Sequence, residues 1–362
     1  MSRIERIRFR QTLRPLRTLF RTSLGSKSIA TSVLVEVTLA GGATGVGEVP
    51  TSFVLPHETP DAIKAVLADA RRALAGAPID DYPAHLATLR KRFGAFHMTR
   101  SGLEVALFRA ELASRGESEL AFWSGRSRSV ETDITVTFIP DERDLSRWMK
   151  HVTRIGFRHY KVKVTGDVAA DIAFVKAVRE HLEPLAEGYV IRLDGNQGYE
   201  ADSYRRMLDG LRRAKIDIEL FEQPLAAGDF AGLRKIAGCS SVPVILDETV
   251  FDAEACRRVV DERLGDGVSI KIAKSGIAQS AAILKCARAG GLKLMIGCMT
   301  ETMVGLSAGI YMAAGTAAFD YVDLDAAHLL FGARRRGDIT IAGRKYLIDG
   351  QAPARGRSGG EQ

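Results

Sequence analysis

From about residue 132 onward, the sequence alternates between short apolar segments and longer segments with helical periodicity. The apolar segments resemble buried β-strands and cover residues 133–138, 159–164, 189–194, 218–222, 243–247, 268–272, 293–297 and 320–324. Helical patterns lie between them, for example at 168–182, 202–214, 252–263, 277–289 and 302–314. A strand–helix repeat of about 25 residues, sustained over eight strands, predicts a TIM-like barrel of parallel strands. An open dinucleotide-binding sheet is not favoured, because no Gly-x-Gly-x-x-Gly follows the first strand.

The first 125 residues follow a different pattern. Segments 3–10 and 31–39 alternate like antiparallel strands, with a polar segment at 20–28 that predicts a loop between them. The fold class is therefore α/β: a (β/α)7β TIM-like barrel with an α+β capping domain. We assign 1–125 to the capping domain, 126–330 to the catalytic barrel, and 331–362 to a C-terminal segment that returns to the capping domain. The Gly-, Arg- and Ser-rich residues at the end of that segment, from 352 on, are predicted to be disordered.

Three of the predicted barrel strands end in a carboxylate, at Asp194, Glu222 and Asp247. These acids are 28 and 25 residues apart, the length of one strand, one helix and two short loops. Acids are common in such loops, but the carboxyl ends of neighbouring barrel strands converge on one spot, where barrel enzymes place their active sites. An all-oxygen ligand set at that spot predicts a Mg²⁺ site.

Lysines accompany these acids. Lys161 and Lys163 alternate on one strand, so both amines project from the same face. Lys271 lies in the sixth strand, where a buried lysine is costly unless its amine reaches a site. The second and sixth strands lie across the barrel from each other, so Lys163 and Lys271 would face a substrate from opposite sides and could move a proton from one face of a carbon to the other. The nearby Lys161, with the metal ion, would lower the pKa of Lys163; Lys274 is predicted to be a solvated loop lysine.

The eighth strand carries two acids, Asp323 and Asp325, on one face. If both point inward, beside three acids already committed to a metal, the site needs another positive charge, such as a substrate ammonium group. A surface-facing acidic pair is equally compatible with the spacing.

Together these motifs resemble the muconate-lactonizing-enzyme subgroup of the enolase superfamily, whose members use a Lys or His base with Mg²⁺. The matching segments are Lys161-Val162-Lys163, Asp194-Gly195-Asn196, Glu222-Gln223-Pro224, Asp247-Glu248-Thr249 and Lys271-Ile272-Ala273-Lys274. Within that subgroup, Gly297-Cys298-Met299-Thr300-Glu301-Thr302 and Asp323-Leu324-Asp325 are similar to the dipeptide epimerases, including L-Ala-D/L-Glu epimerases. The resemblance covers nearly the whole chain.

The resemblance implies Mg²⁺-dependent epimerisation of the C-terminal residue of a dipeptide, by two-lysine 1,1-proton transfer through an enolate. Asp194, Glu222 and Asp247 would hold the metal, and Lys163 and Lys271 would be the catalytic acid and base. The implied substrate-binding residues are Lys161, Thr135, Cys298, Asp323 and Asp325, with the last two on the α-ammonium group. Family members specific for Ala-Glu carry an arginine in the capping loop, where this sequence has Gly25, with Arg21 and Lys27 nearby; this argues against an acidic second residue.

Composition sets wider limits. The 362 residues are 46% hydrophobic and 26% charged, as in ordinary globular proteins, and no segment is long and apolar enough for a membrane span. The four cysteines form no CxxC pair, and the N-terminus lacks an apolar signal core, which predicts a cytoplasmic protein. We expect a homo-oligomer, a small-molecule dipeptide substrate, and neither nucleic-acid nor membrane partners.

Three alternatives remain. A muconate-type cycloisomerase or o-succinylbenzoate synthase would share the metal and the lysines, but its substrate has no ammonium group for Asp323 and Asp325. A Schiff-base aldolase would need no three-acid metal site, so it would survive chelation by EDTA. The net charge of +7 allows a nucleic-acid-binding protein, which would bind DNA or RNA with a steep salt dependence.

Overall fold

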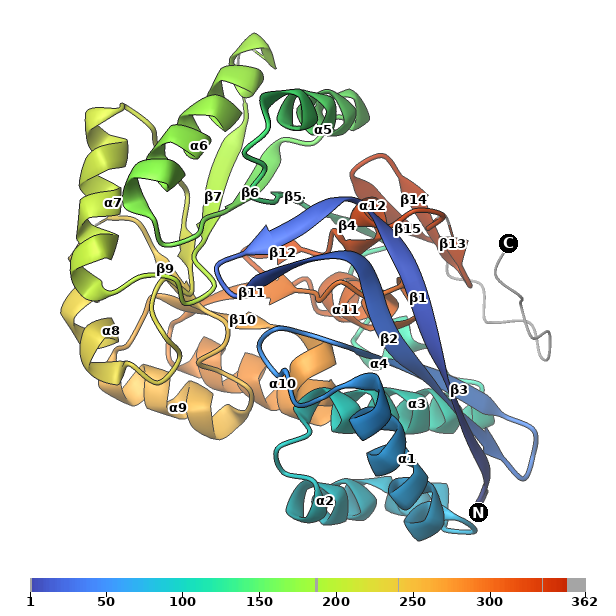
Figure 1. Ribbon diagram of the computed structural model, residues 1–362. Helices are drawn as coiled ribbons and strands as arrows, with labels where there is room; N and C mark the ends of the chain where they lie inside the picture. Colours follow the sequence, from blue (N-terminus) through green and yellow to red (C-terminus); the bar gives the residue numbers. More distant parts are fainter. Residues whose placement is uncertain (1, 186–187, 240, 334, 350–362) are drawn as a thin grey trace.

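The computed structural model describes residues 2–185, 188–239, 241–333 and 335–349, and its centre is an eight-stranded parallel barrel (Figure 1). Hydrogen-bonded strands follow the order β12-β11-β10-β9-β8-β7-β6-β5. Asp133 N donates to Val322 O at 3.2 Å and links the first strand to the last. The strands are β5 (Ile134–Val136), β6 (His159–Lys163), β7 (Val190–Asp194), β8 (Phe221–Glu222), β9 (Val244–Leu246), β10 (Gly267–Ile270), β11 (Lys293–Gly297) and β12 (Tyr321–Asp323). The predicted barrel is confirmed.

Helices surround the barrel (Figure 1), and several of them begin at an acidic N-cap. Asp141, Asp167 and Asp252 each accept a hydrogen bond from a backbone N–H of the first helical turn, which satisfies donors that the helix itself leaves free. The helices are α5 (Glu142–Ile155), α6 (Val168–Leu182), α7 (Ala201–Arg213), α8 (Phe230–Ile236), α9 (Ala253–Glu262), α10 (Ile272–Ala289), α11 (Met303–Thr316) and α12 (Ala326–Leu329). Helix α10 is kinked at Gly276, whose φ is +76°, so a short first turn precedes the predicted helix at 277–289.

The N-terminal sheet is a long antiparallel hairpin with a third strand: β1 (Ile4–Thr22), β2 (Gly25–Leu39) and β3 (Thr44–Pro50). The predicted loop at 20–28 is wrong, because Phe20 pairs with Lys27 and Thr22 pairs with Gly25. The strands continue almost to the turn, and the hairpin tip reaches the barrel mouth, where Ser23 Oγ donates to Asn196 O at 2.6 Å. A tertiary contact thus stabilises strand structure in a polar segment that the residue pattern alone assigns to a loop.

Four helices complete the N-terminal part: α1 (Pro60–Leu74), α2 (Tyr82–Arg92), α3 (His97–Arg115) and α4 (Glu119–Phe122). Helix α3 packs closely on β3 at two glycines, because a Cβ at Gly45 or Gly47 would collide with the α3 backbone at Ala106 O or Gly102 O. Glu48, next to these glycines, accepts hydrogen bonds from Thr302 N and Thr302 Oγ1 at 2.9 and 2.6 Å. The N-terminal part is thereby fixed to the segment that follows β11.

The C-terminal strands form a separate small sheet. Its order is β13 (Arg335–Arg336), β14 (Ile339–Ala342), β15 (Lys345–Ile348) and β4 (Ser129–Glu131), so the C-terminal segment pairs with the strand just ahead of the barrel. The division into 1–125, 126–330 and 331–362 stays a prediction. The disorder predicted from residue 352 on lies outside the described residues.

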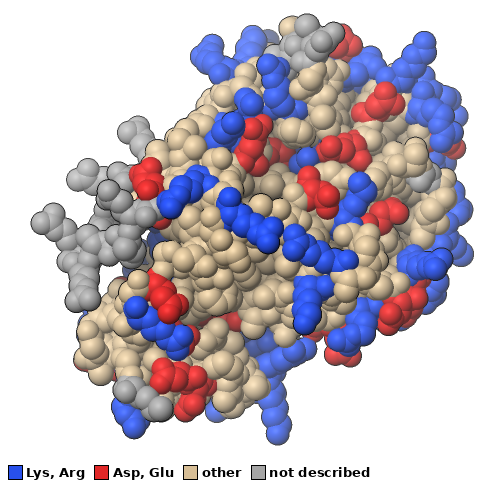
Figure 2. All heavy atoms as spheres, turned by 180° about the vertical axis from the view of Figure 1, so that it is seen from behind, with Lys and Arg blue, Asp and Glu red and all other residues tan. Residues whose placement is uncertain are grey.

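The described chain contains no helix long and apolar enough to cross a membrane. Figure 2 shows the face opposite to that of Figure 1, where Lys and Arg side chains occur in many places with Asp and Glu among them.

Candidate active site

The three predicted metal ligands lie side by side at the carboxyl ends of their strands. Asp194 ends β7, Glu222 ends β8, and Asp247 directly follows β9. The register of the barrel pairs Lys163 with Asp194 and Asp194 with Glu222, so these side chains share one level of the barrel. The three carboxylates are buried, with exposed fractions of 0%, 0% and 4%.

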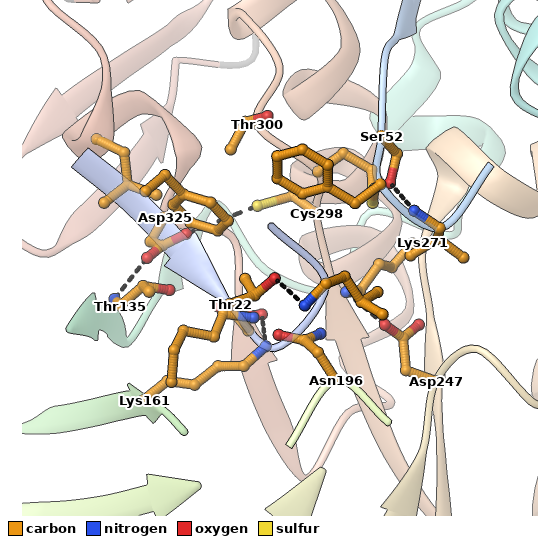
Figure 3. A pocket seen from close by; sticks show the side chains of 18 of the residues that line it. Thr22, Ser52, Thr135, Lys161, Asn196, Asp247, Lys271, Cys298, Thr300 and Asp325 are labelled. Carbon is orange, nitrogen blue, oxygen red and sulfur yellow. Dashed lines mark hydrogen bonds and ion pairs between the residues drawn. The ribbon is translucent and has the colours of Figure 1, made fainter. Parts of the chain in front are cut away.

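The predicted lysines contact these carboxylates directly. Lys161 Nζ lies 3.0 Å from Asp194 Oδ2 and 2.6 Å from Glu222 Oε2. Lys163 Nζ lies 2.5 Å from Asp194 Oδ2, and Lys271 Nζ lies 2.7 Å from Asp247 Oδ2. Figure 3 shows Lys161 and Lys271 entering the site from opposite sides. The row of acids thus has an amine at each end and one in the middle.

This charge arrangement perturbs both partners. Burial alone would raise the pKa of Asp194, but the ammonium groups of Lys161 and Lys163 hold it below its ordinary value. Burial alone would lower the pKa of Lys271, but the charges of Asp247 and Glu222 hold it above its ordinary value.

The donor set fits a hard divalent cation. All three side chains offer carboxylate oxygens, and each of them is paired with at least one lysine amine. Three buried carboxylates are costly unless cations compensate them, which the lysine amines do here and a divalent ion would do when bound. Asp194, Glu222 and Asp247 could therefore hold an ion such as Mg²⁺.

Asp323 and Asp325 line the same pocket as the lysines, and Figure 3 shows Asp325 on the opposite side of it from Asp247. Lys161 Nζ lies 2.6 Å from Asp323 Oδ2, and Thr135 N donates to Asp325 Oδ2 at 2.6 Å. With Asp133, they form a compact group in which one carboxylate oxygen of each residue lies within 4.8 Å of the others. This group is tighter than the predicted metal ligands and could also hold a cation. Of the two, we favour the Glu222 group for a divalent ion, because Asp133 is already paired with the guanidinium of Arg192, which cannot lose its charge, whereas the cations on the Glu222 group are lysines.

Asp133 and its partner Arg192 were missed by the sequence pattern. Arg192 Nη1 lies 2.8 Å from Asp133 Oδ2, and both side chains are buried. Arg192 has the same strand parity as Asp194, which is the one available signal that it points inward. Burial, together with Asp323, raises the pKa of Asp325 to about 6. Arg192 and Lys161 compensate part of the negative charge of Asp133, Asp323 and Asp325.

The solvated position predicted for Lys274 is wrong. Its side chain is 3% exposed, and its Nζ lies 2.5 Å from Asp247 Oδ1 and also donates to Asp247 O. The first turn of α10, ahead of the kink at Gly276, folds this lysine back over the carboxylate. Its amine is a second cation on a predicted metal ligand.

Glu248 is another buried acid that the pattern did not single out. Asn196 Nδ2 donates to Glu248 Oε1 at 3.2 Å, and both residues line the pocket. Burial raises the pKa of Glu248 to about 8, with Asp247 and Asp194 adding to the shift.

The pocket lies between the barrel mouth and the N-terminal hairpin (Figure 3). Thr135 and Cys298 line it, and Cys298 Sγ lies 3.8 Å from Asp325 Oδ1. Six of its lining residues are apolar: Phe20, Leu24, Phe53, Val54, Met299 and Leu329.

Lys27 is a cationic side chain among these apolar lining residues. Lys27 Nζ donates to Thr51 O at 3.3 Å and lies 5.6 Å from the centre of the Phe53 ring. Burial lowers the pKa of Lys27 to about 8. Gly25 stands where Ala-Glu-specific family members carry an arginine; it lies against Phe53, and Arg21 lines a different cleft. In the described structure, Lys27 is the lysine of the pocket without a carboxylate partner.

Comparisons with known proteins agree with this geometry. The family model described as "Enolase C-terminal domain-like" matches residues 144–354. An aromatic dipeptide epimerase from Herpetosiphon aurantiacus is 32% identical over 312 residues, 86% of each chain. The substrate-liganded L-Ala-D/L-Glu epimerase from Bacillus subtilis superposes with a TM-score of 0.89 at 29% identity, over 97% of this chain and 98% of that one. A dipeptide epimerase from Enterococcus faecalis, complexed with Mg and L-Leu-L-Tyr, gives 0.88 at 26% identity, over 97% and 98%.

Proposed function

The chain belongs to the enolase superfamily, as a member of the enolase C-terminal domain-like family, and from that membership we propose that it is a Mg²⁺-dependent dipeptide epimerase. The reaction inverts the α-carbon of the dipeptide's C-terminal residue. The resemblance that the sequence motifs indicated is confirmed by the family match and by the dipeptide epimerases among the relatives.

The metal would be held by Asp194, Glu222 and Asp247. Two observations support this: their oxygen-only donor set, and their burial at the carboxyl ends of three neighbouring strands, β7, β8 and β9. When bound, Mg²⁺ supplies positive charge that stabilises the enolate oxygens of the substrate, and such electrostatic stabilisation is usually the largest contribution to catalysis.

Lys163 and Lys271 would exchange the α-proton. Their amines stand at the two ends of the acid row, so one can remove the proton from one face and the other can return a proton to the opposite face. A proton-transferring amine must first lose its own proton, and in the free site the acids raise the pKa of Lys271. A divalent cation on the same acids would compensate their charge and lower that pKa. Lys161, between the two, would donate to the substrate carboxylate.

The pair Asp323 and Asp325 carries the assignment to dipeptides. Both acids are buried and line the pocket, where they would bind the α-ammonium group of the substrate. The alternative, a muconate-type cycloisomerase or o-succinylbenzoate synthase, uses substrates without an ammonium group, and two buried acids would repel their carboxylates.

A library of L,L-dipeptides incubated with the protein in deuterated water tests this function. We expect mass spectrometry to show one deuterium at the C-terminal residue's α-carbon of selected dipeptides, and chiral analysis to show the L,D product. Prior treatment with EDTA should abolish both signals, and added Mg²⁺ should restore them. Turnover that persists in EDTA, or a library without any deuterated dipeptide, contradicts the proposal.

A further inference from the structure

Two lysines contact Asp247, and they contact different atoms of it. Lys271 Nζ lies 2.7 Å from Oδ2, whereas Lys274 Nζ lies 2.5 Å from Oδ1 and also contacts the backbone carbonyl of the same residue. Lys274 therefore spans the main chain and the side chain of Asp247. That double contact restricts rotation of the carboxylate in a way that Lys271, which touches one oxygen, does not.

The surroundings of Lys274 make this contact durable. Its side chain is 3% exposed, and its amine lies 5.3 Å from the centre of the Phe251 ring. Its backbone N–H donates to Lys271 O at 3.0 Å, which keeps it close to the end of β10. Asp247 N in turn donates to Gln223 Oε1 at 2.8 Å. The main chain and the Oδ1 side of Asp247 are thus held from both flanks.

We infer that Lys274 is a positioning residue: its amine occupies Asp247 Oδ1, which leaves Oδ2 as the oxygen that would bind the metal. This inference rests on the proposed metal site at Asp194, Glu222 and Asp247. It also gives the two lysines of the segment different tasks. Lys271 must leave Asp247 to act on substrate, whereas Lys274 stays and keeps the carboxylate oriented after Lys271 has left.

Two opposite effects of Lys274 on metal binding can be separated by experiment. As a positive charge near the site, its amine repels a cation; as an orienting group, it strengthens binding. Groups that orient a metal ligand are typically worth about 10–100-fold in metal affinity. If orientation dominates, removing the amine weakens binding; if repulsion dominates, removing it tightens binding.

The experiment is calorimetric titration of Mg²⁺ into the chelator-treated protein. We expect Lys274→Met to raise the Mg²⁺ Kd about 10–100-fold. Lys274→Arg keeps the charge and can reach two acceptors, so its Mg²⁺ Kd should lie between those of the wild type and Lys274→Met. At saturating Mg²⁺, Lys274→Met should recover most of its kcat, whereas loss of a proton-transferring lysine could not be rescued by metal. Lys293→Met, an exposed lysine at the start of β11, is the matched control and should leave the Kd unchanged.

An unchanged or tighter Kd in Lys274→Met, in a protein with wild-type circular dichroism and unfolding midpoint in EDTA, overturns the role of Lys274. If Lys274→Met does not fold, Lys274→Gln keeps one hydrogen-bond donor without the charge and is expected to raise the Kd at least tenfold; an unchanged Kd there overturns the inference equally. Absence of Mg²⁺ binding in the wild-type protein overturns the proposed function as well, so the two failures are distinguishable.

Discussion

Lys161 and Asp323 are joined inside the barrel, with Nζ 2.6 Å from Oδ2, although their strands are separated by β5. The same amine lies 2.6 Å from Glu222 Oε2. One ammonium group thus connects the proposed metal ligands with the proposed ammonium site. Buried charges are costly without partners. A cation bound at Glu222 would therefore change the charge balance between Lys161 and Asp323, and an ammonium group bound at Asp323 would change the balance between Lys161 and Glu222.

Asp323→Asn tests the ammonium site. The substitution removes a buried negative charge but keeps the shape, so dipeptides should lose a charge-assisted contact. Losing one partner of a buried charge pair costs about 2–5 kcal/mol, so kcat/KM should fall at least about 30-fold. Steady-state kinetics on the best dipeptide measures this. Asp320→Asn, an exposed acid just ahead of β12, serves as control. Unchanged dipeptide turnover in Asp323→Asn would make the dipeptide assignment wrong.

Single replacements of the two proton-transferring lysines should separate exchange from epimerisation. We expect Lys163→Ala and Lys271→Ala each to lower epimerisation by about 10²–10⁴-fold or more. Each variant should still exchange the α-proton of one epimer with deuterated solvent, because the remaining amine serves one face. Proton NMR of both epimers in deuterated water resolves the exchange. If both variants retained exchange of the same epimer, the two amines could not flank the carbon.

Much of this architecture is readable from local pattern. Segments 168–182 and 293–297 were predicted to the residue, because a strand–helix repeat with capping acids depends on nearby residues alone. Eight of the ten predicted site residues line one pocket, and the other two, Asp194 and Glu222, contact its Lys161. The reason is the same: strand ends with inward parity meet in any parallel barrel. Their individual roles, the domain limits, the cytoplasmic location and the homo-oligomeric state stay predictions.

Features that depend on distant segments were missed. Asp133 and Arg192, 59 positions apart in the chain, come together only when β5, β6 and β7 pair in the barrel. The hairpin through residues 20–28 depends on contacts with the barrel mouth, and Lys274 turns inward because Gly276 breaks the helix behind it. Apart from the inward strand parity of Arg192, none of these contacts leaves a periodic trace in the sequence.

Lys27 should influence which side chain the pocket accepts. Its amine lies beside the Phe53 ring and has no carboxylate partner among the described residues, so an acidic substrate side chain could pair with it. A charge-assisted hydrogen bond is worth about 1.5–3 kcal/mol, so Lys27→Met should lower the preference for L-Ala-L-Glu over L-Ala-L-Gln about tenfold or more. The ratio of kcat/KM values measures the preference. Arg21→Met, on the cleft beyond β1, should not change it; equal ratios in wild type and Lys27→Met would exclude Lys27 from substrate selection.

Glu104 should make stability depend on pH, away from the chemistry. It lies on α3, buried against α10, where its Oε1 accepts a hydrogen bond from Ala278 N at 2.8 Å. Burial raises the pKa of Glu104 to about 7, from an ordinary value of 4.5. The folded protein therefore holds this proton more tightly than the unfolded chain. The resulting stabilisation is fully present below pH 4.5 and is lost as the pH rises toward and through 7.

Glu104→Gln keeps an oxygen for Ala278 N but cannot ionise, so it should not lose this stability. Each pH unit between the two pKa values corresponds to about 1.4 kcal/mol. The free energy of unfolding of the variant, relative to the wild type, should therefore rise by roughly 2–3 kcal/mol between pH 5 and pH 8. Urea unfolding at both pH values, with the exposed Glu5→Gln as control, measures the difference. A constant difference across this range would mean that Glu104 is already ionised in the folded protein at pH 5, and that the hydrogen bond from α10 outweighs its burial.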